Sequence, residues 1–155
     1  MGKIRSRTVG WMLACCLAFF SCDKVEEGDY YTKNRELTGK QEVPRVGTSA
    51  SGNFTVIYTP GSGKVRMNMS WEDLSSPVRR AYIQGPASRG QRGGILVDFT
   101  RKIDKVESGT FHTKFFLNGT NQLEKDLLAG LWYINIQTDR HPEGEIRGQI
   151  ELKLK

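Results

Sequence analysis

Hydrophobic and polar residues alternate along much of this chain, and the clearest case lies near its C-terminus. In residues 145–154, apolar side chains and Gly148 occupy every second position, while charged or amide side chains fill the positions between them. This period of two predicts a strand with one buried face and one solvent-facing side. Residues 131–138 alternate in the same way, and residues 139–144 carry the turn formers Pro142 and Gly144. We therefore predict an antiparallel hairpin here.

Six further segments favour strands because they alternate or are rich in β-branched and aromatic residues. They are residues 36–43, 54–59, 64–71, 78–84, 95–99 and 109–117. In residues 64–71 the apolar positions are Val65, Met67, Met69 and Trp71. We interpret the two methionines as core filler and not as metal ligands, because they share a face with valine and tryptophan.

One helix interrupts this series of strands. In residues 121–129, Leu123, Leu127 and Leu128 form an apolar stripe, and Gly130 suits the end of a helix. Many short strands with close turn signals predict an all-β fold. We expect an antiparallel β-sandwich of about seven to nine short strands, with one short helix near residues 121–129.

The first 21 residues resemble a bacterial lipoprotein signal peptide of the Bacteroidetes kind. An apolar stretch of residues 9–20 follows three basic residues, and Ser21 precedes Cys22, the expected lipidation site. The apolar stretch is too short to span a bilayer comfortably. A signal peptide cut without lipidation and an uncleaved anchor are the alternatives.

Residues 22–34 read as an acidic tether and residues 35–155 as the folded domain. The acidic run after Cys22 is similar to the tag that exports Bacteroidetes lipoproteins to the cell surface, and a solvated linker is the alternative. We expect an outer-membrane lipoprotein of the cell envelope, held to the membrane by its lipid. Its orientation, periplasmic or surface-exposed, stays open.

Charge and cysteine content exclude several function classes. The chain has 23 basic and 17 acidic residues, but three of the basic ones lie in residues 1–21. The remaining balance is ordinary, and no dense basic run alternates with aromatic residues, so we predict no nucleic-acid binding. The three cysteines are Cys15, Cys16 and Cys22, so the domain contains neither a disulfide nor a thiol nucleophile.

Three parts of the sequence together resemble the CHRD domain, a module named after chordin and also found in exported bacterial proteins. They are LTGKQEVP at residues 37–44, LSSPV with AYIQGPA at residues 74–87, and LLAGLWYINI with HPEGEIRGQI at residues 127–150. The resemblance covers roughly residues 37–150. It implies an all-β sandwich with no settled biochemical activity.

Departures from the family pattern bear on metal binding. Family members often carry a His-x-His pair in the central strand and a third histidine on a later strand. This chain has Tyr82 and Gln84 at the pair and Gln137 at the third place, so only His141 remains. A tight transition-metal site usually needs three or four His, Cys or carboxylate ligands. We therefore expect no metal or other cofactor, and interpret His141 as a turn residue that bonds the backbone.

Catalytic motifs are missing from the sequence. It contains no G-x-S-x-G elbow, P-loop, dinucleotide fingerprint or H-E-x-x-H segment. Glu143 and Glu145 could be a glycosidase pair, but acids on a hairpin are usually solvent-facing. Glu145 and Arg147 share a face, as an ion pair or as two separately solvated charges. We predict no catalytic residues and no enzymatic activity.

We expect the domain to act as a non-catalytic binding or structural module. A glycan or protein ligand would contact aromatic, amide and arginine side chains near the loops. The candidate binding residues are Tyr82, Gln84, Arg89, Arg92, Gln137 and His141. Ordinary surface residues of a spacer are one alternative, and a metal-binding or superoxide-dismutase-like protein is another, disfavoured by the missing histidines.

Overall fold

The computed structural model describes residues 24–117 and 121–155; the expected signal peptide and Cys22 lie outside them. The elements are β1 (Tyr30–Thr38), the 3-10 helix η1 (Gly39–Gln41), β2 (Ser51–Thr59), β3 (Lys64–Glu72), β4 (Val78–Gly85), β5 (Gly94–Asp98), β6 (Gly109–Phe116), α1 (Asn121–Leu128), β7 (Trp132–Thr138), β8 (Ile146–Ile150) and β9 (Lys153–Leu154). The all-β prediction and the short helix are confirmed. No helix within the described segments is both long and apolar enough to cross a membrane.

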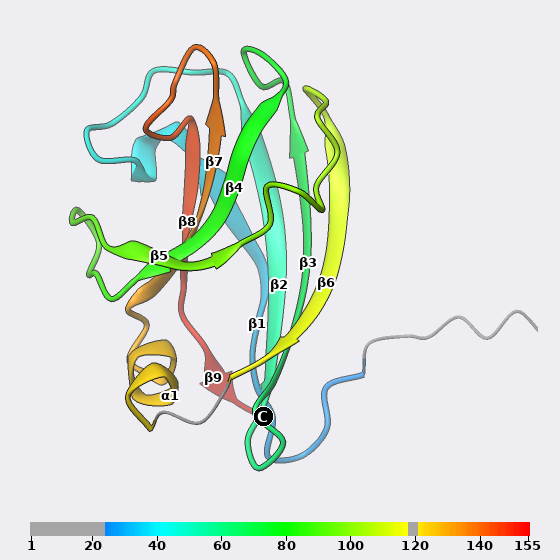
Figure 1. The fold of residues 1–155 in the computed structure, drawn as a ribbon. Coiled ribbons are helices and arrows are strands. Elements are labelled where there is room, and N and C mark those ends of the chain that lie inside the picture. The colour runs from blue at the N-terminus through cyan, green and yellow to red at the C-terminus, as the bar shows by residue number, and fades with distance from the viewer. Residues whose placement is uncertain (1–23, 118–120) are drawn as a thin grey trace, which may run out of the picture.

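The strands form one continuous antiparallel sheet that curls on itself (Figure 1). Its order is β5-β4-β7-β8-β1-β2-β3-β6, and β9 pairs with the start of β1. The two layers of the predicted sandwich are therefore halves of a single sheet. They join between β8 and β1, where Thr38 pairs with Arg147. This junction places the end of β1, and the loop after it, beside the C-terminal hairpin.

The hydrophobic core lies between the two halves of the sheet. One buried cluster combines Val65, Met67, Met69 and Trp71 of β3 with Ile134 and Ile136 of β7 and Ile146 and Ile150 of β8. Met67 is 0 % exposed, so the prediction that the methionines fill the core is confirmed. Gly148 lies where β8 passes close to β1 and β2: a Cβ there would collide with Phe54 and Leu37. Leu127 of α1 is also fully buried in the cluster.

The predicted C-terminal hairpin is confirmed, but its polar side is not solvent-facing. β7 and β8 pair from Trp132 with Ile150 to Ile136 with Ile146. The polar residues between the apolar ones, Glu145, Arg147 and Gln149, are nevertheless 0 %, 1 % and 3 % exposed. The expectation of solvent-facing acids was wrong for Glu145, because distant loops cover this side of the hairpin, whereas Glu143 is exposed. Glu145 and Arg147 are neither an ion pair nor solvated, since each bonds to other protein groups.

The folded region begins earlier than the expected boundary at residue 35. β1 starts at Tyr30 and ends at Thr38, and η1 takes the place of the strand expected to continue to residue 43. Asp29 is also buried, and its carboxylate accepts a hydrogen bond from Thr59 Oγ1 at 2.7 Å. The β1–β2 register shifts between Thr32 and Arg35, where Asn34 has a φ of 51°. This bulge breaks the alternation of apolar and polar residues, so the first half of β1 is not recognisable from the sequence.

Glu145 connects three parts of the chain through its buried carboxylate. It accepts hydrogen bonds from Thr48 Oγ1 at 2.8 Å, from Thr138 Oγ1 at 2.7 Å, and from both the backbone N–H and the hydroxyl of Ser75 at 2.9 and 2.8 Å. Burial raises the pKa of Glu145, but these hydrogen bonds favour the ionised form and outweigh it, so the pKa lies below its ordinary value. Glu145 is therefore a structural carboxylate that fixes the loop after η1 and the β3–β4 loop to the hairpin.

We predict that Glu145→Ala lowers the free energy of unfolding by about 3 kcal/mol, because it leaves the buried donors of three residues without an acceptor. Urea unfolding followed by tryptophan fluorescence measures the effect. The matched control is Glu143→Ala two residues earlier, which removes only an exposed ion pair with Arg92 and should cost less than about 1 kcal/mol. Equal losses in the two variants would contradict the structural role of Glu145.

Candidate functional site

The outward side of the β4–β7–β8 layer is polar and almost entirely buried. The strand register places Tyr82 opposite Asn135 and Asn135 opposite Arg147. In the next row, Gln84 lies opposite Tyr133, and Tyr133 opposite Gln149. We call this set the polar face; its members are Tyr82, Gln84, Tyr133, Asn135, Gln137, Arg147 and Gln149. All except Gln84 are buried.

Two loops cover the polar face. One follows β1 and includes η1, and the other joins β4 to β5; both project from the same side of β7 and β8 (Figure 1). The second loop is bonded to β8 through its backbone, because Gln149 Nε2 donates to the Ala87 carbonyl at 2.9 Å and Arg147 Nη1 donates to the Gln91 carbonyl at 2.7 Å. The strand side chains thus supply the hydrogen bonds that the buried loop carbonyls require.

Arg147 is the central cation of the polar face. Its guanidinium carbon lies 3.5 Å from the centre of the Tyr133 ring, and Nη2 donates to Gln149 Oε1 at 2.9 Å. In the described part of the chain no carboxylate forms an ion pair with it. Burial lowers the pKa of Arg147, while the nearby Tyr133 and Glu42 oppose this effect. The face of Tyr133 is occupied by this cation and is not free to stack on a ligand.

Glu42 reaches the same face from the loop after η1. Its Oε1 accepts a hydrogen bond from Asn135 Nδ2 at 2.8 Å, and its side chain is 5 % exposed. Burial raises the pKa of Glu42 to about 7, although Arg147 and Arg92 act in the opposite direction. Gly144 has a φ of 143°, and a Cβ at this position would collide with both Asn135 Nδ2 and Glu42. Only glycine leaves room for this hydrogen bond.

A cavity of about 230 Å³ opens onto the polar face, and we call it the amide pocket. Its lining residues are Glu42, Gln84, Arg92, Gly93, Tyr133, Asn135, Gln137, Glu143 and Arg147. Two of its buried amide oxygens, Asn135 Oδ1 and Gln137 Oε1, have no hydrogen-bond partner. Buried polar atoms are almost always bonded, so the expected partner of each of these two oxygens is a water molecule or a ligand group.

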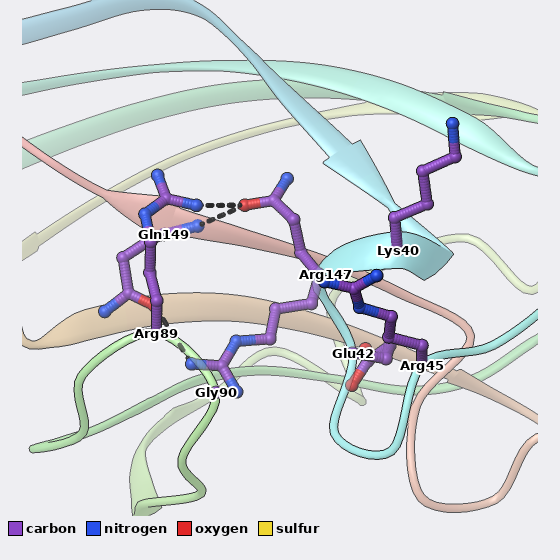
Figure 2. A pocket seen from close by; sticks show the side chains of 8 residues that line it. Lys40, Glu42, Arg45, Arg89, Gly90, Arg147 and Gln149 are labelled. Carbon is purple, nitrogen blue, oxygen red and sulfur yellow. Dashed lines mark hydrogen bonds between the residues drawn. The ribbon is translucent and has the colours of Figure 1, made fainter.

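A second cavity of about 210 Å³ shares Glu42 and Arg147 with the amide pocket. We call it the basic pocket; its lining residues are Lys40, Gln41, Glu42, Arg45, Arg89, Gly90, Arg147 and Gln149. Arg89 Nη1 and the backbone N–H of Gln149 both donate to Gln41 Oε1, at 2.9 and 3.4 Å. Figure 2 shows Lys40 extending from η1 at the edge of the pocket. Arg89 also pairs with Glu151 at 2.8 Å, and this contact holds the pKa of Glu151 below its ordinary value.

The structure brings most of the predicted binding residues into these two cavities. Gln84, Arg92 and Gln137 line the amide pocket, and Arg89 lines the basic pocket. Tyr82 is on the polar face, but it is buried and lines neither cavity. His141 lies in the β7–β8 turn outside both cavities, where its carbonyl accepts from the backbone N–H groups of Thr138 and Gly144.

Sequence reasoning missed Lys40, Gln41, Arg45 and Gln149 of the basic pocket. In the amide pocket it missed Glu42, Tyr133, Asn135 and Arg147. Each of the latter four lies in a segment with a clear pattern, but the pattern assigns the last three to a solvent-facing strand side and Glu42 to a strand end. The available signal was chemical: an amide, a tyrosine and an arginine on adjacent positions of a central hairpin can form a buried hydrogen-bonded network. Nothing in the alternation distinguishes a covered polar side from an open one.

The residues at the family's histidine positions do not fit a transition-metal site. Tyr82, Gln84 and Gln137 do share the polar face, but a phenol and two neutral amides replace the imidazoles. Arg92 and Arg147 add positive charge to the same cavity. Residues 24–117 and 121–155 contain no group of three or more His, Cys, Asp or Glu that could hold a metal ion. No chemistry through a metal is assigned to this site.

Glu42→Gln should change how stability depends on pH. Folding raises the pKa of Glu42 from 4.5 to about 7. The free energy of unfolding therefore falls as the pH increases through that interval. The wild-type domain should therefore lose up to about 3 kcal/mol relative to Glu42→Gln between about pH 4.5 and about pH 7. Urea unfolding over this range tests it, with the exposed Glu72→Gln as the charge-loss control. Parallel stability curves for wild type and Glu42→Gln would contradict it.

Comparison with known proteins identifies the family of this chain and no individual relative. Neither a curated protein nor a solved structure matches the chain. The family model for the CHRD domain matches residues 34–150, which includes every residue of the two cavities. The chain therefore belongs to the CHRD domain family.

Proposed function

We propose that this protein is a lipid-anchored protein of the cell envelope whose CHRD domain binds a saccharide without catalysis, and that the amide pocket is its binding site. Membership of the CHRD family suggests a non-enzymatic binding or structural module. The amide pocket favours the binding alternative over a plain spacer. We assign no reaction to it, because its two carboxyl side chains are bound to other side chains, Glu42 to Asn135 and Glu143 to Arg92.

The observation that carries the proposal is the pair of unpartnered acceptors, Asn135 Oδ1 and Gln137 Oε1. An unsatisfied buried amide oxygen costs about 1–3 kcal/mol, and a ligand hydroxyl that donates to it recovers this free energy. Asn135 is held by Glu42 through its nitrogen, so the side-chain amide keeps a fixed orientation at the wall of the cavity. The pocket is thus arranged before a ligand arrives.

The chemistry of the lining favours a saccharide over a peptide. The pocket combines amide groups of Gln84, Asn135 and Gln137 with the ion pair of Arg92 and Glu143, 2.8 Å apart. A sugar hydroxyl both donates and accepts, which suits such a mixed set. A peptide side chain would require more apolar surface than this lining offers. The volume lies below the roughly 300–1,000 Å³ of drug-sized sites, so it suits one sugar unit.

The placement of the anchor supports recognition away from the membrane. Asp29 is already part of the folded domain and lies seven positions after Cys22, a reach of at most about 25 Å. β1 starts beside β9 at one end of the sheet and runs to η1 at the other end, next to the two cavities (Figure 1). A lipid on Cys22 would therefore keep the domain close to the bilayer with its pockets turned outward.

We predict that Gln137→Met uncouples stability from binding. The variant replaces an unsatisfied buried oxygen by an apolar group of similar size, so its free energy of unfolding should stay equal or rise by about 1 kcal/mol. Its saccharide affinity should fall about tenfold, the equivalent of one lost hydrogen bond. Calorimetric titration with neutral and acidic monosaccharides and trisaccharides measures this, with a tripeptide as a separate probe.

The control variant is Gln122→Met on α1, remote from both cavities. It should bind as the wild type does. Absence of saccharide binding across the panel, or equal binding by wild type and Gln137→Met, would refute the proposed site.

We further predict that Cys22 carries the lipid. Intact mass of the protein extracted from membranes should show a diacylglyceryl or triacyl addition, and Cys22→Ala should lose it and leave the membrane fraction. Cys15→Ala and Cys16→Ala are matched controls that should keep it. Protease treatment of whole cells then distinguishes a surface-exposed domain from a periplasmic one. An unmodified wild-type mass would contradict the anchor.

A further inference from the structure

The basic pocket has far more positive than negative charge. Four of its lining side chains are cationic, namely Lys40, Arg45, Arg89 and Arg147, and its one carboxyl side chain is Glu42. Arg89 has a carboxylate partner in Glu151. Lys40 and Arg45 are exposed and form no ion pair with any described residue. The pocket therefore presents uncompensated positive charge to a ligand.

Arg147 adds a buried donor to this charge. It is 1 % exposed, and its partners are the carbonyls of Gln91 and Ser88 and the side-chain oxygen of Gln149, all of them neutral. These bonds use three of its five N–H groups. A buried cation without a counter-ion is costly, and an anion brought in by a ligand would offset that cost. Glu42, with a pKa of about 7, is only partly ionised near neutrality and neutralises Arg147 incompletely.

The two cavities are neighbours and not independent sites. Glu42 and Arg147 line both, with the amide pocket on the side of Asn135 and the basic pocket on the side of Gln149. Because these two side chains line both cavities, the cavities lie next to each other. A single molecule with hydroxyl groups at one end and an anionic group at the other can therefore occupy both.

We propose that the basic pocket binds an oxyanion, a carboxylate or phosphate, carried by the same saccharide whose hydroxyls occupy the amide pocket. The ligand is thus an acidic saccharide. The planar guanidinium groups of arginine suit either oxyanion, since each presents parallel N–H donors. This inference rests on the proposed function and extends it, because it names the class of sugar and a second group of contact residues.

The test compares an acidic sugar with its uncharged ester on the full chain purified in detergent. Trigalacturonate and its trimethyl ester have the same hydroxyls and differ in charge. We expect the acid to bind at least tenfold more tightly, and the difference to shrink at high salt because ions screen the exposed cations. The double variant Lys40→Gln/Arg45→Gln should lose this preference and keep its affinity for the ester. Glucose 6-phosphate and inorganic phosphate distinguish the source of the anion.

The matched control is Lys102→Gln/Lys114→Gln, which removes two exposed positive charges elsewhere on the domain. It should keep the preference for the acid. Equal affinity for acid and ester, or inorganic phosphate binding with no gain from the sugar, would overturn the acidic-saccharide inference. Equal binding of acid and ester through Gln137 would leave the proposed function intact, whereas failure of every saccharide would refute both. Tight binding of glucose 6-phosphate that depends on Lys40 and Arg45 would support the inference with phosphate as the anion.

Discussion

The buried guanidinium of Arg147 connects β7, β8 and the β4–β5 loop. It stacks on Tyr133 of β7, bonds to Gln149 of its own strand and holds backbone carbonyls of the β4–β5 loop. Those bonds hold the loop against the outer side of the hairpin. The loop thereby buries a polar strand side that the alternation predicts to face solvent. Glu145 also holds loops to the hairpin, because its carboxylate accepts hydrogen bonds from Thr48, Ser75 and Thr138. The hydrophobic core holds the two halves of the sheet together, and the hydrogen bonds of Arg147 and Glu145 hold specific loops against the sheet.

Much of the fold can be predicted from the sequence, because the residue pattern within each short segment indicates a strand or a helix. The alternation in residues 64–71 and 109–117 corresponds to β3 and β6, and the leucine stripe corresponds to α1. The failures also have local causes. The bulge at Asn34 breaks the period of β1, and the polar side of β8 is covered by segments some 50 to 110 positions away in the chain. Alternation shows that a strand has two different sides, but it does not show what lies against the polar one.

The site was predictable only in part for the same reason. Gln84, Arg92 and Gln137 were recognised as polar residues near loops, and they line the amide pocket. Glu42 and Asn135 were not, because their role depends on a hydrogen bond between residues 93 positions apart. The positions where the family resemblance leads one to expect histidines carry Tyr82, Gln84 and Gln137 here, and all three lie on the polar face. Neutral amide oxygens beside Arg147 and Arg45, which form no ion pair with any described residue, suit the proposed acidic sugar better than a metal ion.

The central claim is that Asn135 Oδ1 and Gln137 Oε1 are contacts for an external ligand. The most direct measurement is ¹H–¹⁵N NMR of the side-chain amide groups of these two residues while the full chain is titrated with trigalacturonate. We expect both signals to shift and saturate together, while the amide signals of Gln122 on α1 stay in place. Unmoved Asn135 and Gln137 signals at a concentration that saturates other resonances would contradict it, since binding would then occur outside the amide pocket.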